Sequence, residues 1–175
     1  MEDMIQTSLF RVFRLERPRV PNRQNGGRWS LGLTLIELVV IVAIVMALTA
    51  ISIPAYEKYR ETTRIAQAVI DIRTIEHDIL IHEGFAGKLP DGLSEVGKQY
   101  ARDPWGNVYR YFNVTSGQGN GVRRFDKLAV ALNTDFDLYS LGRDGKTNAS
   151  LSNADSLDDI VRGRNGDYLG IASKY

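Results

Sequence analysis

The chain has 175 residues and a formal net charge of only +1, and it contains no cysteine. This length is enough for one domain and an anchoring segment. The lack of cysteine excludes disulfide bonds and thiol catalysis, so an exported domain of this size needs another means of stabilisation. The charge is unevenly distributed: residues 1–32 hold six arginines against three acidic residues, whereas the remainder has a slight acidic excess.

Residues 1–32 are predicted to be a leader peptide. The arginines are interspersed with prolines and a Gly-Gly pair, which is typical of a flexible segment. An arginine-rich stretch can also bind nucleic acid, but the leader interpretation is favoured here and no nucleic-acid partner is expected. Arginines that precede a membrane helix keep that end in the cytoplasm, so we expect the C-terminal part to face outward.

Residues 33–53 form an apolar run in which Glu37 carries the one charge. A helix of this length spans a hydrocarbon core about 30 Å thick, so the run is predicted to be a transmembrane helix. A carboxylate inside a membrane costs on the order of 2.5–3.5 kcal/mol and usually has a partner. Cleavage after Gly32 would create an amino group at Leu33 that could pair with Glu37 of a neighbouring copy. Equally, Glu37 could reach the lipid headgroups from the helix end.

The sequence Gly-Leu-Thr-Leu-Ile-Glu-Leu-Val at residues 32–39 resembles the processing site of type IV pilins and type II secretion pseudopilins. The resemblance implies that a prepilin peptidase cuts after Gly32 and that the new N-terminal residue, Leu33, is methylated. It also implies that Glu37 sets the register between subunits in a filament. Pro54 would be the twenty-second mature residue, where the family also tends to have a proline.

Two features depart from the family pattern. The first mature residue is leucine where the family usually has phenylalanine. The leader of 32 residues is longer than most family leaders, which indicates either a long leader or a true start further downstream.

Residues 54–84 are predicted to continue the helix beyond a kink at Pro54, giving one nearly continuous helix from Leu33 to about Glu83. Apolar residues recur there at spacings of three and four, which indicates one buried face. These residues are Ile65, Val69, Ile72, Ile75 and Ile79. Gly84 is a plausible end of the helix.

Residues 85–175 are predicted to form a globular head with a small antiparallel sheet. We expect strands at 108–114, 128–132 and 136–141, and a final short strand within 162–171. The fold class is therefore α+β, with a long N-terminal helix packed on a small sheet, as in the pilin-like fold. The turn at residues 103–107 also resembles the head of the major pseudopilin, where it is scaffold.

Two groups of side chains could suggest ligand sites, but structural roles are favoured for both. Histidines at 77 and 82 are five residues apart and do not share a helical face, so a solvated polar face is favoured over a metal pair. A cluster of aromatic residues could stack on sugars or bases, but covering the sheet is favoured. The cluster comprises Trp105, Tyr109, Tyr111 and Phe112.

The polar loop at residues 141–159 is a candidate calcium site. It contains four acidic residues, and calcium binds six to eight hard oxygen ligands. From the residues alone, a solvated acidic loop is favoured. The sequence before and within the loop is similar to the calcium-binding segment of the major pseudopilin, however. The resemblance implies ligands from the Asp144 side chain and the Leu141 carbonyl, with Asp159 or Asp158 as the second acid.

The leading hypothesis is a structural subunit that is stored in the bacterial inner membrane with its head in the periplasm. As the resemblance implies, it would be processed by a prepilin peptidase and methyltransferase and assembled by an inner-membrane platform. The product would be a type II secretion pseudopilus, either a homopolymer or a mixed filament with minor pseudopilins. A type IV pilin for adhesion or motility is the alternative. A membrane-anchored enzyme or a calcium-dependent binding module is a more remote alternative, because the head lacks the common catalytic motifs.

Overall fold

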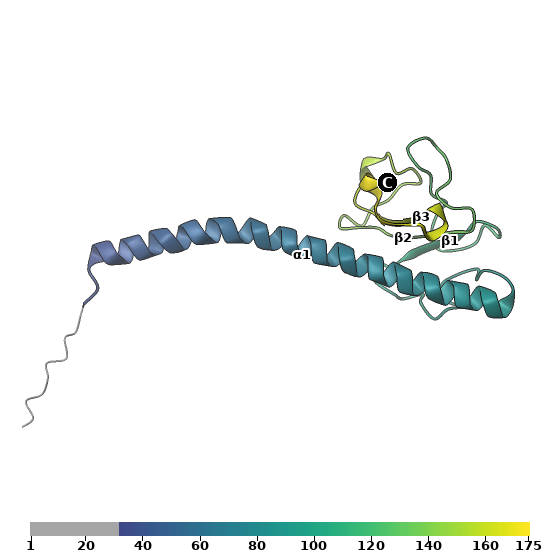
Figure 1. Cartoon of the computed structure of the whole chain (residues 1–175), viewed down its shortest axis with the longest axis horizontal. Helices are drawn as coiled ribbons and strands as arrows, with labels where there is room; N and C mark the ends of the chain where they lie inside the picture. Colours follow the sequence, from purple (N-terminus) through teal and green to yellow (C-terminus); the bar gives the residue numbers. More distant parts are fainter. Residues whose placement is uncertain (1–31) are drawn as a thin grey trace, which may run out of the picture. The chain divides into compact units, whose positions relative to one another are not determined.

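The computed structural model describes residues 32–175, so the first 31 residues of the predicted leader lie outside the described residues. The chain divides into two compact units, Met1–Ala43 and Ile44–Tyr175. Within residues 32–175 one long helix, α1, is followed by a sheet of four strands and three short 3-10 turns (Figure 1). This is the predicted α+β class.

Helix α1 comprises Leu35–Ala86. It begins directly after Thr34, and it continues through Pro54 without losing its helical assignment. It ends where Gly87 adopts a φ of +70° and donates its N–H to the carbonyl of Glu83 at 2.8 Å. A residue in this conformation is a common helix end, and glycine adopts it without strain. The helix therefore extends slightly past the predicted stop at Gly84.

The first part of α1 exposes its apolar side chains. Its most apolar window has a mean hydropathy of 2.7, and none of that window is buried. Leu35, Ile44 and Ile51 are 81%, 54% and 72% exposed. By length and composition α1 could cross a membrane. Apolar surface this extensive needs a lipid environment or another protein surface to cover it.

The four strands are antiparallel and lie in chain order across the sheet. They are β1 (Arg110–Asn113), β2 (Phe136–Ser140), β3 (Ile160–Gly163) and β4 (Tyr168–Ile171). Residue Tyr111 pairs with Leu138, and Tyr139 pairs with Val161. Strands β2 and β3 are central, and all of their residues are buried.

The face of the sheet toward α1 forms the main apolar core. The helix contributes residues at spacings of three and four, which places them on one face. The buried apolar helix residues are Ala68, Ile72, Ile75 and Ile79. They pack with Phe136, Leu138 and Ile160 from the sheet. Ile65 and Val69 are partly buried at the same core, as the periodicity predicts.

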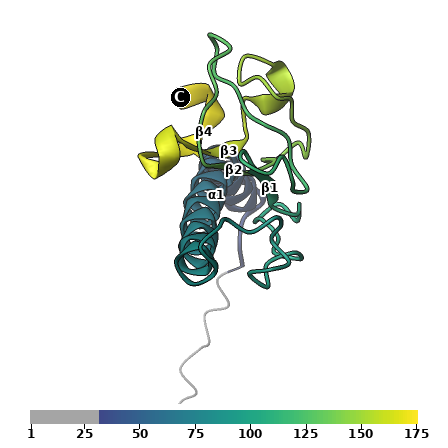
Figure 2. The same cartoon turned by 90° about the vertical axis from the view of Figure 1, so that its right-hand side faces the viewer.

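The opposite face of the sheet is covered by loops, which lie beyond the strands from α1 in the end-on view (Figure 2). Successive strand residues point to opposite faces, so Tyr139 and Val161 face these loops. They pack with Leu132, Leu141 and Leu151 in a second, smaller core. This two-sided cover explains why β2 and β3 are buried along their whole length.

Two strand predictions differ from the structure. No strand forms at 128–132, because Asp126 accepts the N–H groups of Leu128 and Val130 at 2.8 Å and Ala129 adopts a φ of +60°. These features make a turn there. Strand β3 was not predicted, because Arg162 interrupts its apolar pattern and Ile160–Gly163 lies where the predicted polar loop meets the tail.

Candidate functional site

The predicted cleavage point precedes the helix. Gly32 and Leu33 are exposed and non-helical, and Leu33 is 68% exposed. A Cβ atom added at Gly32 would meet nothing within 4 Å. The peptide between Gly32 and Leu33 is therefore accessible within the described residues. Its cleavage and the methylation of Leu33 stay predictions.

Glu37 caps the start of α1. Its Oε2 atom accepts the backbone N–H and the hydroxyl of Thr34, both at 2.9 Å, and Thr34 Oγ1 accepts the N–H of Glu37 at 3.3 Å. This reciprocal pair is a capping box, which satisfies N–H groups that the first helical turn leaves free. Glu37 thus has a local role in the uncleaved chain. The predicted register role of Glu37 and the predicted kink at Pro54 stay predictions.

Two polar turns that are distant in the sequence meet at the end of β2. Asp103 Oδ1 accepts the N–H groups of Trp105 and Asn107, which closes the turn at residues 103–107. The Ser140 hydroxyl donates to Asp103 Oδ2 at 2.5 Å, and Asn107 Nδ2 donates to the carbonyl of Gly142 at 2.8 Å. The first turn therefore supports the start of the loop that was predicted to bind calcium.

Asp158 holds the other side of that loop. Its Oδ2 atom accepts the N–H groups of Arg143 and Asp144 at 2.8 and 3.0 Å. Gly142 lies at a φ of +63°, and a Cβ there would come within 2.5 Å of the Asp158 carbonyl oxygen. Asp144 is exposed, and its Oδ1 atom accepts the N–H of Lys146 at 2.8 Å. Of the two candidate second acids, Asp158 is thus the one that contacts the turn of Asp144.

Asp159 points elsewhere and contacts an arginine. Its side chain is fully buried, and its Oδ2 atom accepts from Arg124 Nη2 and from the Thr147 hydroxyl, both at 2.6 Å. Burial raises the pKa of Asp159 to about 6, although the charge of Arg124 and the two hydrogen bonds oppose this. Asp159 Oδ1 is buried without a hydrogen-bond partner among the described residues.

The predicted calcium ligands therefore separate into two places. Asp144, Asp158 and Leu141 belong to the turn after β2, whereas Asp159 belongs to an ion pair with Arg124. Among residues 32–175, no group of three or more histidine, cysteine or acidic residues could hold a metal ion. Calcium binding stays a prediction, and the geometry gives Asp158 a better position than Asp159 for it.

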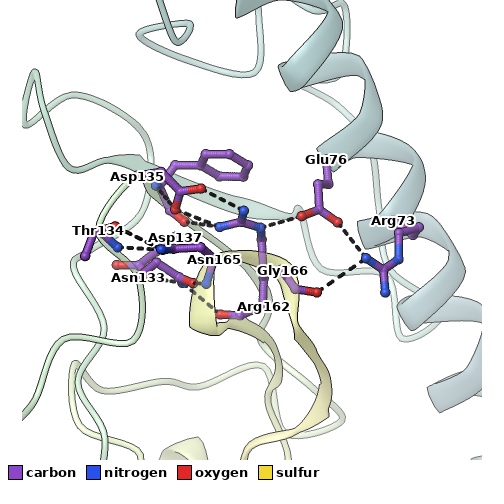
Figure 3. Close-up of polar contacts among 10 residues, drawn as sticks. Arg73, Glu76, Asn133, Thr134, Asp135, Asp137, Arg162, Asn165 and Gly166 are labelled. Carbon is purple, nitrogen blue, oxygen red and sulfur yellow. Dashed lines mark hydrogen bonds and ion pairs between the residues drawn. The ribbon is translucent and has the colours of Figure 1, made fainter.

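A second buried arginine ties the sheet to α1 (Figure 3). Arg162 on β3 donates from Nε to Glu76 Oε1 at 2.7 Å and from Nη2 to Asp135 Oδ2 at 2.8 Å. Its Nη1 atom donates to Asp135 and to the carbonyl of Phe136. Burial lowers the pKa of Arg162, but its bonds to Asp135 and Glu76 raise it more, so the guanidinium stays charged.

The favoured structural roles of the aromatic cluster are confirmed for its two tyrosines. Tyr109 and Tyr111 are 1% and 0% exposed and lie in the main core. Their hydroxyl groups donate to Asp71 Oδ2 and to the carbonyl of Pro90.

The two histidines of the chain lie on α1. His77 is exposed, and His82 Nε2 lies 3.4 Å from Glu95 Oε2.

Sequence reasoning missed the two arginines that organise the head, Arg124 and Arg162. Both are polar residues next to apolar ones, and such residues are usually assigned to the solvent side. Their acidic partners are distant in the sequence: Asp159 is 35 residues from Arg124, and Glu76 is 86 residues from Arg162. No local pattern indicates such pairs.

A long N-terminal apolar helix whose second part packs on a four-stranded antiparallel sheet defines a pilin-like α+β protein. The chain is 28% identical over 149 residues to the type II secretion system core protein G of Pseudomonas aeruginosa. The similarity covers 73% of this chain and 94% of that relative. It confirms the predicted resemblance to the pseudopilins of type II secretion. No protein-family model matches the chain, and no solved structure matches it.

Proposed function

We propose that this chain is a structural subunit of a type II secretion pseudopilus, with no catalytic role of its own. The observation that carries the proposal is the exposed apolar start of α1 in a chain similar to a type II secretion core protein. Such a surface can contact lipid before assembly and pack against the helices of other copies afterwards. The exposed position of Gly32 and Leu33 further supports the proposal, because a membrane peptidase needs access to the peptide it cuts.

The proposed life cycle has two stages. The precursor lies in the bacterial inner membrane with its N-terminus in the cytoplasm and its head in the periplasm, as the arginines of the leader favour. After cleavage and methylation by the prepilin peptidase, an assembly platform extracts the subunit into a filament with other copies and with minor pseudopilins.

Mass spectrometry of the mature N-terminus tests the processing step. We expect a chain that begins with N-methylated Leu33, and we expect Gly32→Leu to leave the precursor uncut. Gly84→Ala serves as the control, because a Cβ at Gly84 meets nothing within 4 Å. A mature chain that begins at Met1 would contradict the proposal.

Variants at the capping box separate the two possible roles of Glu37. Glu37→Gln keeps the capping geometry but removes the charge, whereas Thr34→Ala removes the cap and keeps the carboxylate. If the carboxylate sets the register, the Gln variant is processed but does not assemble, and the Ala variant assembles. Filament yield in cells measures this, and equal assembly of both variants would contradict the register role.

Deletion of the gene distinguishes the secretion filament from the alternative, a type IV pilus. We expect loss of secreted proteins from the medium, with twitching motility unchanged. Loss of twitching with normal secretion would instead support the pilus.

A further inference from the structure

The loop at residues 141–159 has an unbalanced charge and no covalent support. It contains four acidic and two basic residues, and the chain has no cysteine. Asp159 at its end is fully buried at the junction with β3. A buried carboxylate needs a positive partner or several hydrogen bonds, because it loses its hydration.

Arg124 provides that partner from another segment of the head. Arg124 is 1% exposed. Its Nη2 atom donates to Asp159 Oδ2 at 2.6 Å, and its Nη1 atom donates to the hydroxyl of Thr147. The Thr147 hydroxyl donates in turn to the same Asp159 oxygen. The guanidinium carbon also lies 4.4 Å from the ring centroid of Tyr139 on β2. One cation thus contacts the middle of the loop, its end and the sheet beneath it.

Backbone hydrogen bonds hold Arg124 between the sheet and the loop. Its own N–H donates to Asp137 Oδ2 on β2 at 2.8 Å. The next residue, Phe125, donates to the carbonyl of Ala149 and accepts from the N–H of Leu151, at 2.8 and 2.9 Å. The segment that carries Arg124 is therefore bonded to the sheet on one side and to the loop on the other.

We propose that Arg124 is the cation that closes the 141–159 loop, so that the folded head needs no calcium ion at Asp159. Asp159 itself offers one carboxylate oxygen that accepts no hydrogen bond within the described residues, whereas calcium takes six to eight oxygen ligands. Asp159 Oδ2 already accepts from two side chains, and Oδ1 is a single remaining atom. A divalent cation at Oδ1 would also be repelled by the guanidinium on the same carboxylate.

Melting of the Asp144→Ala chain in detergent, with added calcium or with excess chelator, tests the proposal, because this substitution removes the predicted calcium ligand in the turn after β2 and leaves Arg124 and Asp159 unchanged. We expect the same melting temperature in both conditions. A melting temperature that rises with calcium would overturn the proposal. This comparison is valid even if the variants below do not fold, and it does not depend on which filament the chain enters.

Variants test the role of the guanidinium itself. Arg124→Gln leaves Asp159 buried and unpaired, and we expect the melting temperature to fall by about 10 °C or more. The matched control is Arg123→Gln, because Arg123 is the preceding residue and is exposed. The double variant Arg124→Gln, Asp159→Asn removes both charges, and we expect it to recover part of the loss. An Arg124→Gln melting temperature equal to the control, or a double variant that is no better than Arg124→Gln, would overturn the proposal.

Discussion

Two buried arginines, Arg124 and Arg162, neutralise carboxylates on opposite faces of the sheet. Arg162 contacts Glu76 on the helix side, and Arg124 contacts Asp159 on the loop side. Each guanidinium also lies over an aromatic ring, at 3.9 Å from the Phe136 centroid and 4.4 Å from the Tyr139 centroid. Arginine suits these positions because its planar group can donate in several directions and stack at the same time.

The two arginines that contact Glu76 should differ strongly in their contribution to stability. Removal of buried Arg162 leaves Glu76 without its main partner, and we expect Arg162→Ala to lower the free energy of unfolding by about 3–5 kcal/mol. Arg73 lies 3.2 Å from the same carboxylate, but its side chain is 62% exposed. Arg73→Ala should therefore cost less than about 1 kcal/mol. Urea denaturation measures both, and equal losses would contradict this assignment.

The conformation of Gly142 should make it sensitive to substitution. Gly142→Ala combines a positive φ with a Cβ placed 2.5 Å from the carbonyl oxygen of Asp158. Gly117 has a similar φ of +71° but open space around its Cα. We expect Gly117→Ala to lose about 1 kcal/mol from backbone strain and Gly142→Ala to lose clearly more. Thermal melting compares the two, and similar losses would show that the contact with Asp158 can relax.

The candidate site could be predicted from the sequence only where its signal is local. Gly32, Leu33 and Glu37 belong to one short motif beside an apolar run, so the sequence predicts the three together, and their roles stay predictions. The acids of the 141–159 loop were also found. Their separation into a turn around Asp158 and an ion pair around Asp159 was not, because it depends on Arg124, which is distant in the sequence.

Among the secondary-structure elements, the long apolar helix was predicted correctly, whereas two of the short strands were not. Helix α1 was predicted within a few residues at each end, because a long apolar run is followed by apolar residues that recur at spacings of three and four. The strand predicted at 128–132 was wrong, since the Asp126 side chain stabilises a turn there that apolar content does not reveal. Strand β3 was missed, because a buried charge at Arg162 resembles a solvent-facing residue in the sequence.

The helix face toward the sheet should tolerate truncation poorly. Ile72 is fully buried against the sheet, whereas Ile70 is 58% exposed on the same helix. We expect Ile72→Ala to lower the free energy of unfolding by about 2–5 kcal/mol, because it removes apolar contacts and leaves a cavity. Ile70→Ala should change it by about 0.5 kcal/mol or less. Chemical denaturation of both variants measures the difference, and a small loss at Ile72 would contradict the packing described here.

For the whole molecule, the exposed apolar start of α1 should decide where the precursor accumulates. We expect the full chain to remain in the membrane pellet after alkaline extraction. Two charges placed in the run, Ile44→Lys and Val45→Lys, should release much of it, because each costs on the order of 2.5–3.5 kcal/mol near the centre of a bilayer. The control pair Lys88→Ala and Lys98→Ala changes charges outside the run. Release of the unaltered chain would contradict membrane anchoring.

The two-sided burial of β2 also determines how the head opens. All five residues of β2 are buried, and the strand is paired with β1 and β3, so its amide hydrogens exchange with solvent only when a covering layer lifts away and the strand pairing opens. The loop layer has the smaller apolar cluster and depends on the Arg124 contacts, so it should open at the lower free energy. Deuterium uptake would then appear first in the loops, and Arg124→Gln would speed uptake in β2 while residues 68–79 of the helix stay protected.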